Sequence, residues 1–115
     1  NKTWKMRLRR TALCDDLLEQ FSRISPKTRF MIWQTTEVAF IDEFGNEEDG
    51  VDQGGLTVEA YTAFFKQIFS SGLFEAAPDA EGAAVLPRAD ASLEKLRALG
   101  RMMLKCVLDD HPIGI

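Results

Sequence analysis

In residues 48–65 an acidic loop, a pair of glycines and an aromatic amphipathic helix follow one another with no linker residues between them. The adjacent Gly54 and Gly55 allow backbone conformations with positive φ, which other residues adopt only at a steric cost. A chain leaving a strand can therefore turn sharply at this pair and enter a helix at once. We expect Gly55→Val to destabilise the fold if the turn holds a positive φ at that position.

Three side chains around the glycines fit the start of a helix. Thr57 is a good N-cap, because its hydroxyl can accept a hydrogen bond from an otherwise unpaired amide. Glu59, in the expected first turn, complements the positive end of the helix dipole. Asp52 could cap the amides of the turn through its carboxylate. The simpler interpretation of two adjacent glycines is an ordinary surface turn.

The segments before this run alternate between strand and helix patterns. Apolar and basic residues alternate over residues 4–9, which predicts a half-buried strand. Thr11 then offers an N-cap for a helix that Ser25-Pro26 ends. Residues 27–36 fit either a strand or a helical turn, and the β-prone residues 38–44 predict a second strand.

The segments after the glycines predict two helices with a loop between them. Apolar residues form one helical stripe, made of Tyr61, Phe64, Phe65, Ile68 and Phe69. Gly72 is expected to close this helix in a left-handed conformation. Residues 76–91 predict a loop or loose hairpin, and Ser92 predicts the N-cap of a helix that runs to about residue 109.

This last helix is apolar around most of its circumference. At 100° per residue, its polar side chains fall in one narrow stripe, made of Glu94, Arg97, Arg101 and Lys105. A surface helix needs an apolar arc of only ~100°. We therefore expect burial on more than one side, with part of the cover lying outside this chain. The chain also begins without Met and ends in an apolar tail, so we expect it to belong to a longer protein.

Composition fits one globular domain: 115 residues, of which 45% are hydrophobic and 28% charged. The net charge of −4 argues against non-specific nucleic-acid binding. Residues 1–10 hold five bases and no acid, whereas residues 42–52 hold six acids and no base. These blocks could meet across the fold, but we expect two solvated faces. No apolar run approaches the ~20 residues that span a bilayer, so we expect no membrane partner.

No residue pattern supplies a catalytic centre, a cofactor site or a metal site. Cys14 lies beside two aspartates, which would raise its thiol pKa, and Cys106 lies inside a predicted helix. Both fit small buried hydrophobes in a reducing compartment. His111 has no metal-ligand partner at helical spacing. A calcium loop starting at Asp42 fails, because Glu47 would occupy its obligatory glycine position.

Three phrases in order carry a resemblance to a known family. Residues 50–64, G-V-D-Q-G-G-L-T-V-E-A-Y-T-A-F, resemble the pattern G-x-D-x-G-G-h-x-x-E-x-a-x-x-F near the start of the HECT ubiquitin-protein ligase domain. Residues 73–75 resemble its G-L-F-E phrase, and residues 99–106 resemble its h-G-R-h-h-G-K-A phrase. The chain departs from the pattern at Leu104, where the family commonly has glycine. The resemblance covers nearly the whole chain and roughly the first third of a HECT domain.

The resemblance implies an α+β fold, mainly helical with short β-strands, in which residues 1–115 are the beginning of the N-lobe and contain no second domain. It implies a parent protein that takes ubiquitin from a conjugating enzyme as a cysteine thioester and passes it to a substrate lysine. The family's catalytic cysteine follows a phrase that is absent here, so this segment would be an inactive scaffold in the cytoplasm or nucleus. Its structural motif would comprise Asp52, Gly54, Gly55, Glu59, Gly100 and Arg101.

Some HECT ligases also carry a ubiquitin-binding patch near the G-L-F-E phrase. Phe74 is the candidate for such a contact here, but the tyrosine that usually follows is missing, so we expect Phe74 in the core. The alternative from another class is a free-standing acidic protein-interaction domain unrelated to ubiquitin.

Overall fold

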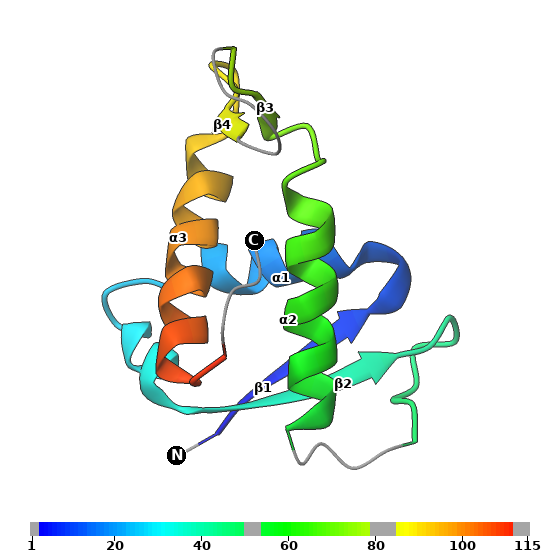
Figure 1. Ribbon diagram of the computed structural model, residues 1–115. Helices are drawn as coiled ribbons and strands as arrows, with labels where there is room; N and C mark the ends of the chain where they lie inside the picture. The colour runs from blue at the N-terminus through cyan, green and yellow to red at the C-terminus, as the bar shows by residue number, and fades with distance from the viewer. Residues whose placement is uncertain (1–2, 50–53, 79–84, 112–115) are drawn as a thin grey trace.

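Short strands and helices alternate along the chain in the computed structural model, which describes residues 3–49, 54–78 and 85–111. In order, the elements are β1 (Thr3–Arg9), η1 (Arg10–Ala12), α1 (Leu13–Ser22), η2 (Arg29–Trp33), β2 (Thr35–Ile41), α2 (Gly55–Ile68), β3 (Phe74–Ala76), β4 (Val85–Pro87) and α3 (Leu93–Leu108). Helices and short strands together confirm the α+β class (Figure 1). Within the described residues, no helix is long and apolar enough to cross a membrane.

Strand β1 is half buried, as its alternating sequence predicted. Trp4, Met6 and Leu8 point into the core, and the residues between them are exposed. β1 pairs in parallel with β2, from Thr3 opposite Thr35 to Arg9 opposite Ile41. A parallel pair needs a long crossover, which α1 and η2 supply.

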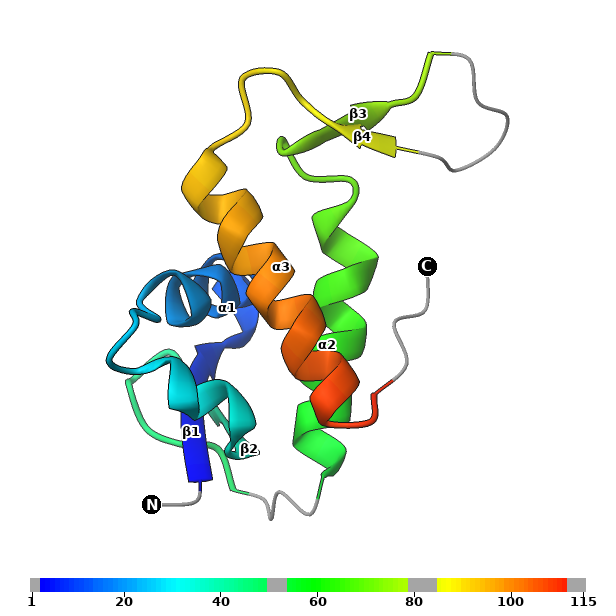
Figure 2. The same ribbon diagram turned by 90° about the vertical axis from the view of Figure 1, so that its left-hand side faces the viewer.

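Two α-helices, α1 and α2, pack on the buried face of this strand pair, and α3 packs on α1 and η2. α1 packs against β1, α2 and α3, and α2 packs against β2. The β3–β4 hairpin joins α2 to α3 at the end away from the β1–β2 sheet (Figures 1 and 2). The predicted stripe of α2 is confirmed, because Tyr61, Phe64, Phe65 and Ile68 are buried in the core.

Two predictions about the ends of α1 and α2 were wrong. Thr11 lies inside the η1 turn, and α1 begins at Leu13 without a side-chain cap. The reason is Asp16, whose carboxylate accepts from the Arg9 amide at 2.8 Å and draws the chain into a tight turn. Gly72 is not left-handed, because α2 already ends at Ile68 and a right-handed Phe69 follows.

The second strand lies three residues earlier than predicted. β2 spans Thr35–Ile41, so it takes the last residues of the ambiguous segment 27–36, whose middle forms the 3₁₀ helix η2. Asp42 ends the strand, since its carboxylate accepts from the amides of Phe44 and Asn46, both at 2.9 Å. Gly45 completes this turn with φ +85°.

Of the two adjacent glycines, only Gly54 has a positive φ. Gly54 precedes α2 with φ +96°, whereas Gly55 is the first helical residue and has no positive φ. The helix therefore begins earlier than predicted, and Thr57 is a buried helical residue instead of its N-cap. Glu59 lies beyond the first turn for the same reason. The predicted turn role of Asp52 falls outside the described residues.

The predictions for the last third of the chain are largely confirmed. β3 and β4 pair antiparallel, so the hairpin predicted for residues 76–91 is confirmed where the structure describes it. Ser92 is the N-cap of α3, and its hydroxyl accepts from the Lys95 amide at 3.3 Å. The helix ends at Leu108, one residue before the predicted end.

Replacing Gly54 with valine should lower the free energy of unfolding by about 1–3 kcal/mol, because valine is strained at φ +96°. Gly55→Ala is the matched control. A Cβ at Gly55 would meet nothing within 4 Å, and alanine is a better helix former. Urea denaturation should place only Gly54→Val below the wild type. Equal midpoints for Gly54→Val and the wild type would show that Gly54 is under no backbone constraint.

Candidate functional site

A wholly buried ammonium group lies where α3 meets η2. The Lys105 side chain has no solvent exposure, and its Nζ donates to the Gln34 carbonyl at 2.5 Å and to Asp109 Oδ1 at 3.0 Å. Lys105 belongs to the polar stripe of the predicted helix, and the structure places it in the core. The i, i+4 spacing places the Asp109 carboxylate within reach of Lys105, whereas the carbonyl at the end of η2 is a partner that helical spacing does not reveal.

Asp109 extends this contact to the sheet and to α2. Its Oδ2 accepts from the Thr36 hydroxyl at 2.5 Å and from the Tyr61 hydroxyl at 3.0 Å. The His111 ring packs on Tyr61 with a centroid separation of 5.3 Å. Burial, with Asp109 adding to it, raises the pKa of Tyr61 well above its ordinary value, so Tyr61 remains a neutral donor. We call Gln34, Thr36, Tyr61, Lys105 and Asp109 the polar cluster.

The polar cluster is saturated with partners and contains no group poised for reaction. A shallow hollow of about 230 Å³ lies beside it, with Thr36, Asp109 and His111 in its wall. Each charged or hydroxyl group of the cluster already holds a hydrogen bond inside the fold. The arrangement can therefore join elements, and it offers no free acid, base or nucleophile.

Two of the family-like residues lie on α3, one turn before Lys105. Arg101 donates to the Phe21 carbonyl at 3.0 Å, which satisfies a carbonyl at the end of α1. Gly100 is exposed, and a Cβ added there would meet nothing within 4 Å. Arg101 thus has a structural role, whereas no contact within the described chain requires glycine at position 100.

The basic and acidic blocks meet across the fold, so the expectation of two solvated faces was wrong. Glu47 accepts from Lys5 at 3.0 Å and from Arg7 at 3.1 Å. Arg10 donates to Glu48 and Glu59 and lies over the Phe40 ring at 3.9 Å. The isolated bridge between Ile41 and Glu47 folds the acidic loop back beside the end of β2, where its carboxylates reach the basic side chains of β1 and η1. Glu59 therefore pairs with Arg10 and joins α2 to η1. It does not lie in the first turn of α2, where it would interact with the helix dipole.

The remaining predicted contact residue, Phe74, is partly buried at the hairpin. Its ring meets Phe69 edge-on, with centroids 5.1 Å apart. The interaction extends the aromatic stripe of α2 into β3. Phe74 therefore takes part in packing, in line with a core position, and its use in binding ubiquitin stays a prediction.

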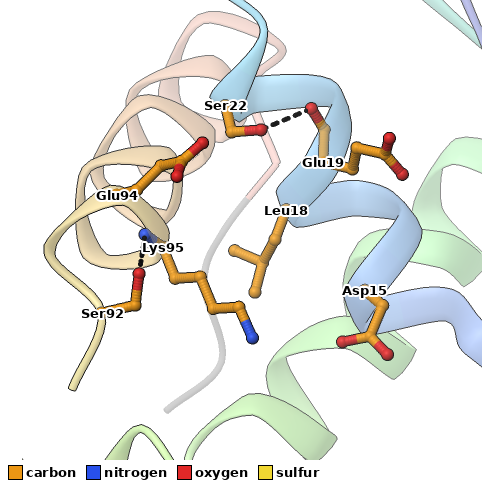
Figure 3. A pocket seen from close by; sticks show the side chains of 7 residues that line it. All are labelled: Asp15, Leu18, Glu19, Ser22, Ser92, Glu94 and Lys95. Carbon is orange, nitrogen blue, oxygen red and sulfur yellow. Dashed lines mark hydrogen bonds between the residues drawn. The ribbon is translucent and has the colours of Figure 1, made fainter. Parts of the chain in front are cut away.

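An open groove separates α1 from the beginning of α3 (Figure 3). It measures about 380 Å³, has the buried Leu18 on one wall and carries carboxylates on Asp15, Glu19 and Glu94. Lys95 extends from α3 across the groove beneath Leu18 (Figure 3). A second hollow of about 360 Å³ continues it toward the end of α2. None of the predicted motif residues lines this groove.

Both cysteines are held as protonated thiols. Burial, then the Asp15 charge, raises the pKa of Cys14, whose Sγ lies 3.5 Å from Gln67 Oε1. Burial raises the pKa of Cys106 to about 12, with Asp109 adding to it and Lys105 opposing it. Because the thiolate is the nucleophilic form, neither side chain suits thioester chemistry at neutral pH. In the described part of the chain, no three His, Cys, Asp or Glu side chains gather as metal ligands.

Within the described residues, α3 is buried along one side only. Its contacts to the core come from Ala98, Leu99, Met102, Lys105 and Cys106. The opposite face leaves large apolar side chains in solvent: Leu93, Leu104, Val107 and Leu108 are 61, 45, 69 and 38% exposed. Gly100 lies on the same face by helical spacing. The expected cover on that face is not supplied by the described residues and stays a prediction.

Comparison with known proteins adds one relative to this picture. No family model matches the chain. The chain is 30% identical over 110 residues to a probable E3 ubiquitin protein ligase of Schizosaccharomyces pombe. The match covers 89% of this chain and 10% of that protein, so the chain spans about a tenth of its relative's length. The similarity connects most of this chain with one part of a probable ubiquitin ligase.

Replacing Lys105 with methionine should lower the free energy of unfolding by about 2–3 kcal/mol, because the Gln34 carbonyl and Asp109 lose a buried donor. Lys95→Met is the control: Lys95 is exposed, so its substitution should change stability by less than about 0.5 kcal/mol. Chemical denaturation of both variants measures the difference. Equal stabilities of the two variants would show that the polar cluster contributes nothing.

Proposed function

We propose that this chain is the opening part of the N-lobe of a HECT-type ubiquitin-protein ligase and serves there as scaffold. The observation that carries the proposal is the 30% identity, across most of the chain, to a tenth of a probable E3 ubiquitin protein ligase. The family-like phrases of residues 50–64 and 99–106 make the proposal specific to the HECT type. The parent protein would take ubiquitin from a conjugating enzyme and pass it to protein substrates in the cytoplasm or nucleus.

The contacts around α3 support a scaffold role. Arg101 and Lys105, both in the family-like phrase of residues 99–106, bind backbone carbonyls at the ends of α1 and η2. They fix the direction of α3 relative to the sheet, while the protonated Cys14 and Cys106 leave the segment without a nucleophile. Transfer chemistry would therefore depend on a cysteine elsewhere in the parent protein.

A thioester assay tests the enzyme class. The longer protein that carries this chain, incubated with charged conjugating enzyme, should form a ubiquitin adduct that reducing agent removes. Cys14→Ala and Cys106→Ala in that protein should leave the adduct intact, and the 115 residues alone should form none. A reducible adduct on the isolated chain that Cys14→Ala or Cys106→Ala abolishes would refute the scaffold role. A longer protein that forms no thioester would refute the HECT type.

The exposed face of α3 yields a second test. If further lobe sequence covers Leu93, Leu104 and Val107, the isolated chain should bind a hydrophobic dye or self-associate, and the longer protein should do neither. Polar substitution at Leu104 and Val107 should then reduce dye binding by the isolated chain. An isolated chain that is monomeric, dye-silent and cooperatively folded would favour the free-standing interaction domain instead.

A further inference from the structure

The short helix η2 exposes the two largest apolar side chains of its segment. Trp33 is 70% exposed and Phe30 is 54% exposed, although Ile32 between them is buried at 6%. A 3₁₀ helix has three residues per turn, so side chains three apart lie on the same side. Phe30 and Trp33 therefore form one aromatic surface that faces solvent.

This surface is held in place before any partner arrives. The Gln34 amide donates to the Met31 carbonyl at 3.1 Å, and the Met31 amide donates to the Thr28 carbonyl at 3.0 Å. Lys105 fixes the end of the segment through the Gln34 carbonyl. A preorganised surface loses less conformational entropy on binding than a flexible loop does.

The charged side chains of the segment that carries the two rings, residues 20–36, are all basic. No acidic residue occurs between Glu19 and Glu37, and Lys27 and Arg29 are both exposed. Neither cation forms an ion pair within the described part of the chain. Exposed aromatics beside arginine are the residues that dominate binding energy at protein interfaces.

We infer that Lys27, Arg29, Phe30 and Trp33, the η2 surface, bind an acidic amphipathic helix of a partner protein. The apolar face of such a helix would cover the two rings, and its flanking carboxylates would meet Lys27 and Arg29. This inference does not rest on the proposed function, because it uses only side chains that face away from the core.

Tryptophan fluorescence offers a direct assay on the chain. Trp4 is buried at 4% exposure, so a change in emission reports on Trp33. The probe is a synthetic helix with leucines at i, i+3, i+4 and i+7 and glutamates at the flanking positions. Its addition should shift the Trp33 emission to shorter wavelength, and the shift should weaken as salt is raised. A second peptide with lysines in place of the glutamates should cause no shift.

Variants locate the contact. Phe30→Gln, and separately the pair Lys27→Glu with Arg29→Glu, should each weaken binding of the acidic peptide by about tenfold or more. Phe44→Gln is the matched control, because Phe44 is 79% exposed but lies in the acidic turn after β2. This variant should bind the acidic peptide with the affinity of the wild type. Circular dichroism confirms that each variant is folded.

Three outcomes would overturn the inference. The first is no emission shift with the acidic peptide, or an equal shift with the basic one. The second is a shift with phosphatidylserine vesicles and none with the acidic peptide, which would make the surface a membrane contact. The third is a shift that depends on protein concentration without added peptide, which would mean that a second copy of the chain covers Trp33.

Discussion

The arrangement of elements depends on the hydrogen bonds that the buried Lys105 ammonium group donates to the Gln34 carbonyl and to Asp109. A buried charge is costly unless it is paired and hydrogen-bonded, and Lys105 meets both conditions through Asp109 and the Gln34 carbonyl. Replacing both members of such a pair with apolar side chains is often nearly neutral, whereas removing one member leaves the other buried without its partner. The pair also bears on orientation, because these hydrogen bonds hold α3 with Lys105 against the Gln34 carbonyl.

From this point the polar cluster links elements that are far apart in sequence. Asp109 accepts from Thr36 on β2 and from Tyr61 on α2, so one carboxylate joins three elements. Arg101 and Arg9 act similarly at the two ends of α1, where they bind the Phe21 carbonyl and the Asp16 carboxylate. A two-stranded sheet is marginally stable by itself, so the helices that these contacts hold over β1 and β2 are essential to it.

Periodicity predicted the elements, and tertiary contacts decided their ends. The alternation of residues 4–9 and the stripe of Tyr61, Phe64 and Phe65 have one physical solution each, and both appear in the structure. Thr11 is not the N-cap of α1, because the Asp16 carboxylate holds the chain in a turn before that helix. Thr57 is not the N-cap of α2, because the positive φ at Gly54 starts that helix earlier. The burial of Lys105 did not follow from the sequence, because the Gln34 carbonyl is distant along the chain, although the i, i+4 spacing from Asp109 was a usable signal.

The same contacts give the proposed scaffold its physical content, since they orient α3 with one apolar face inward and the other outward. Amide hydrogen exchange on the wild type and on Lys105→Met tests this most directly. In the variant, the amides of η2 and of the last two turns of α3 should exchange faster, while those of β1 and α1 keep more of their protection. Unchanged exchange in η2 and α3, or an equal loss of protection in every element, would contradict the claim that Lys105 positions α3.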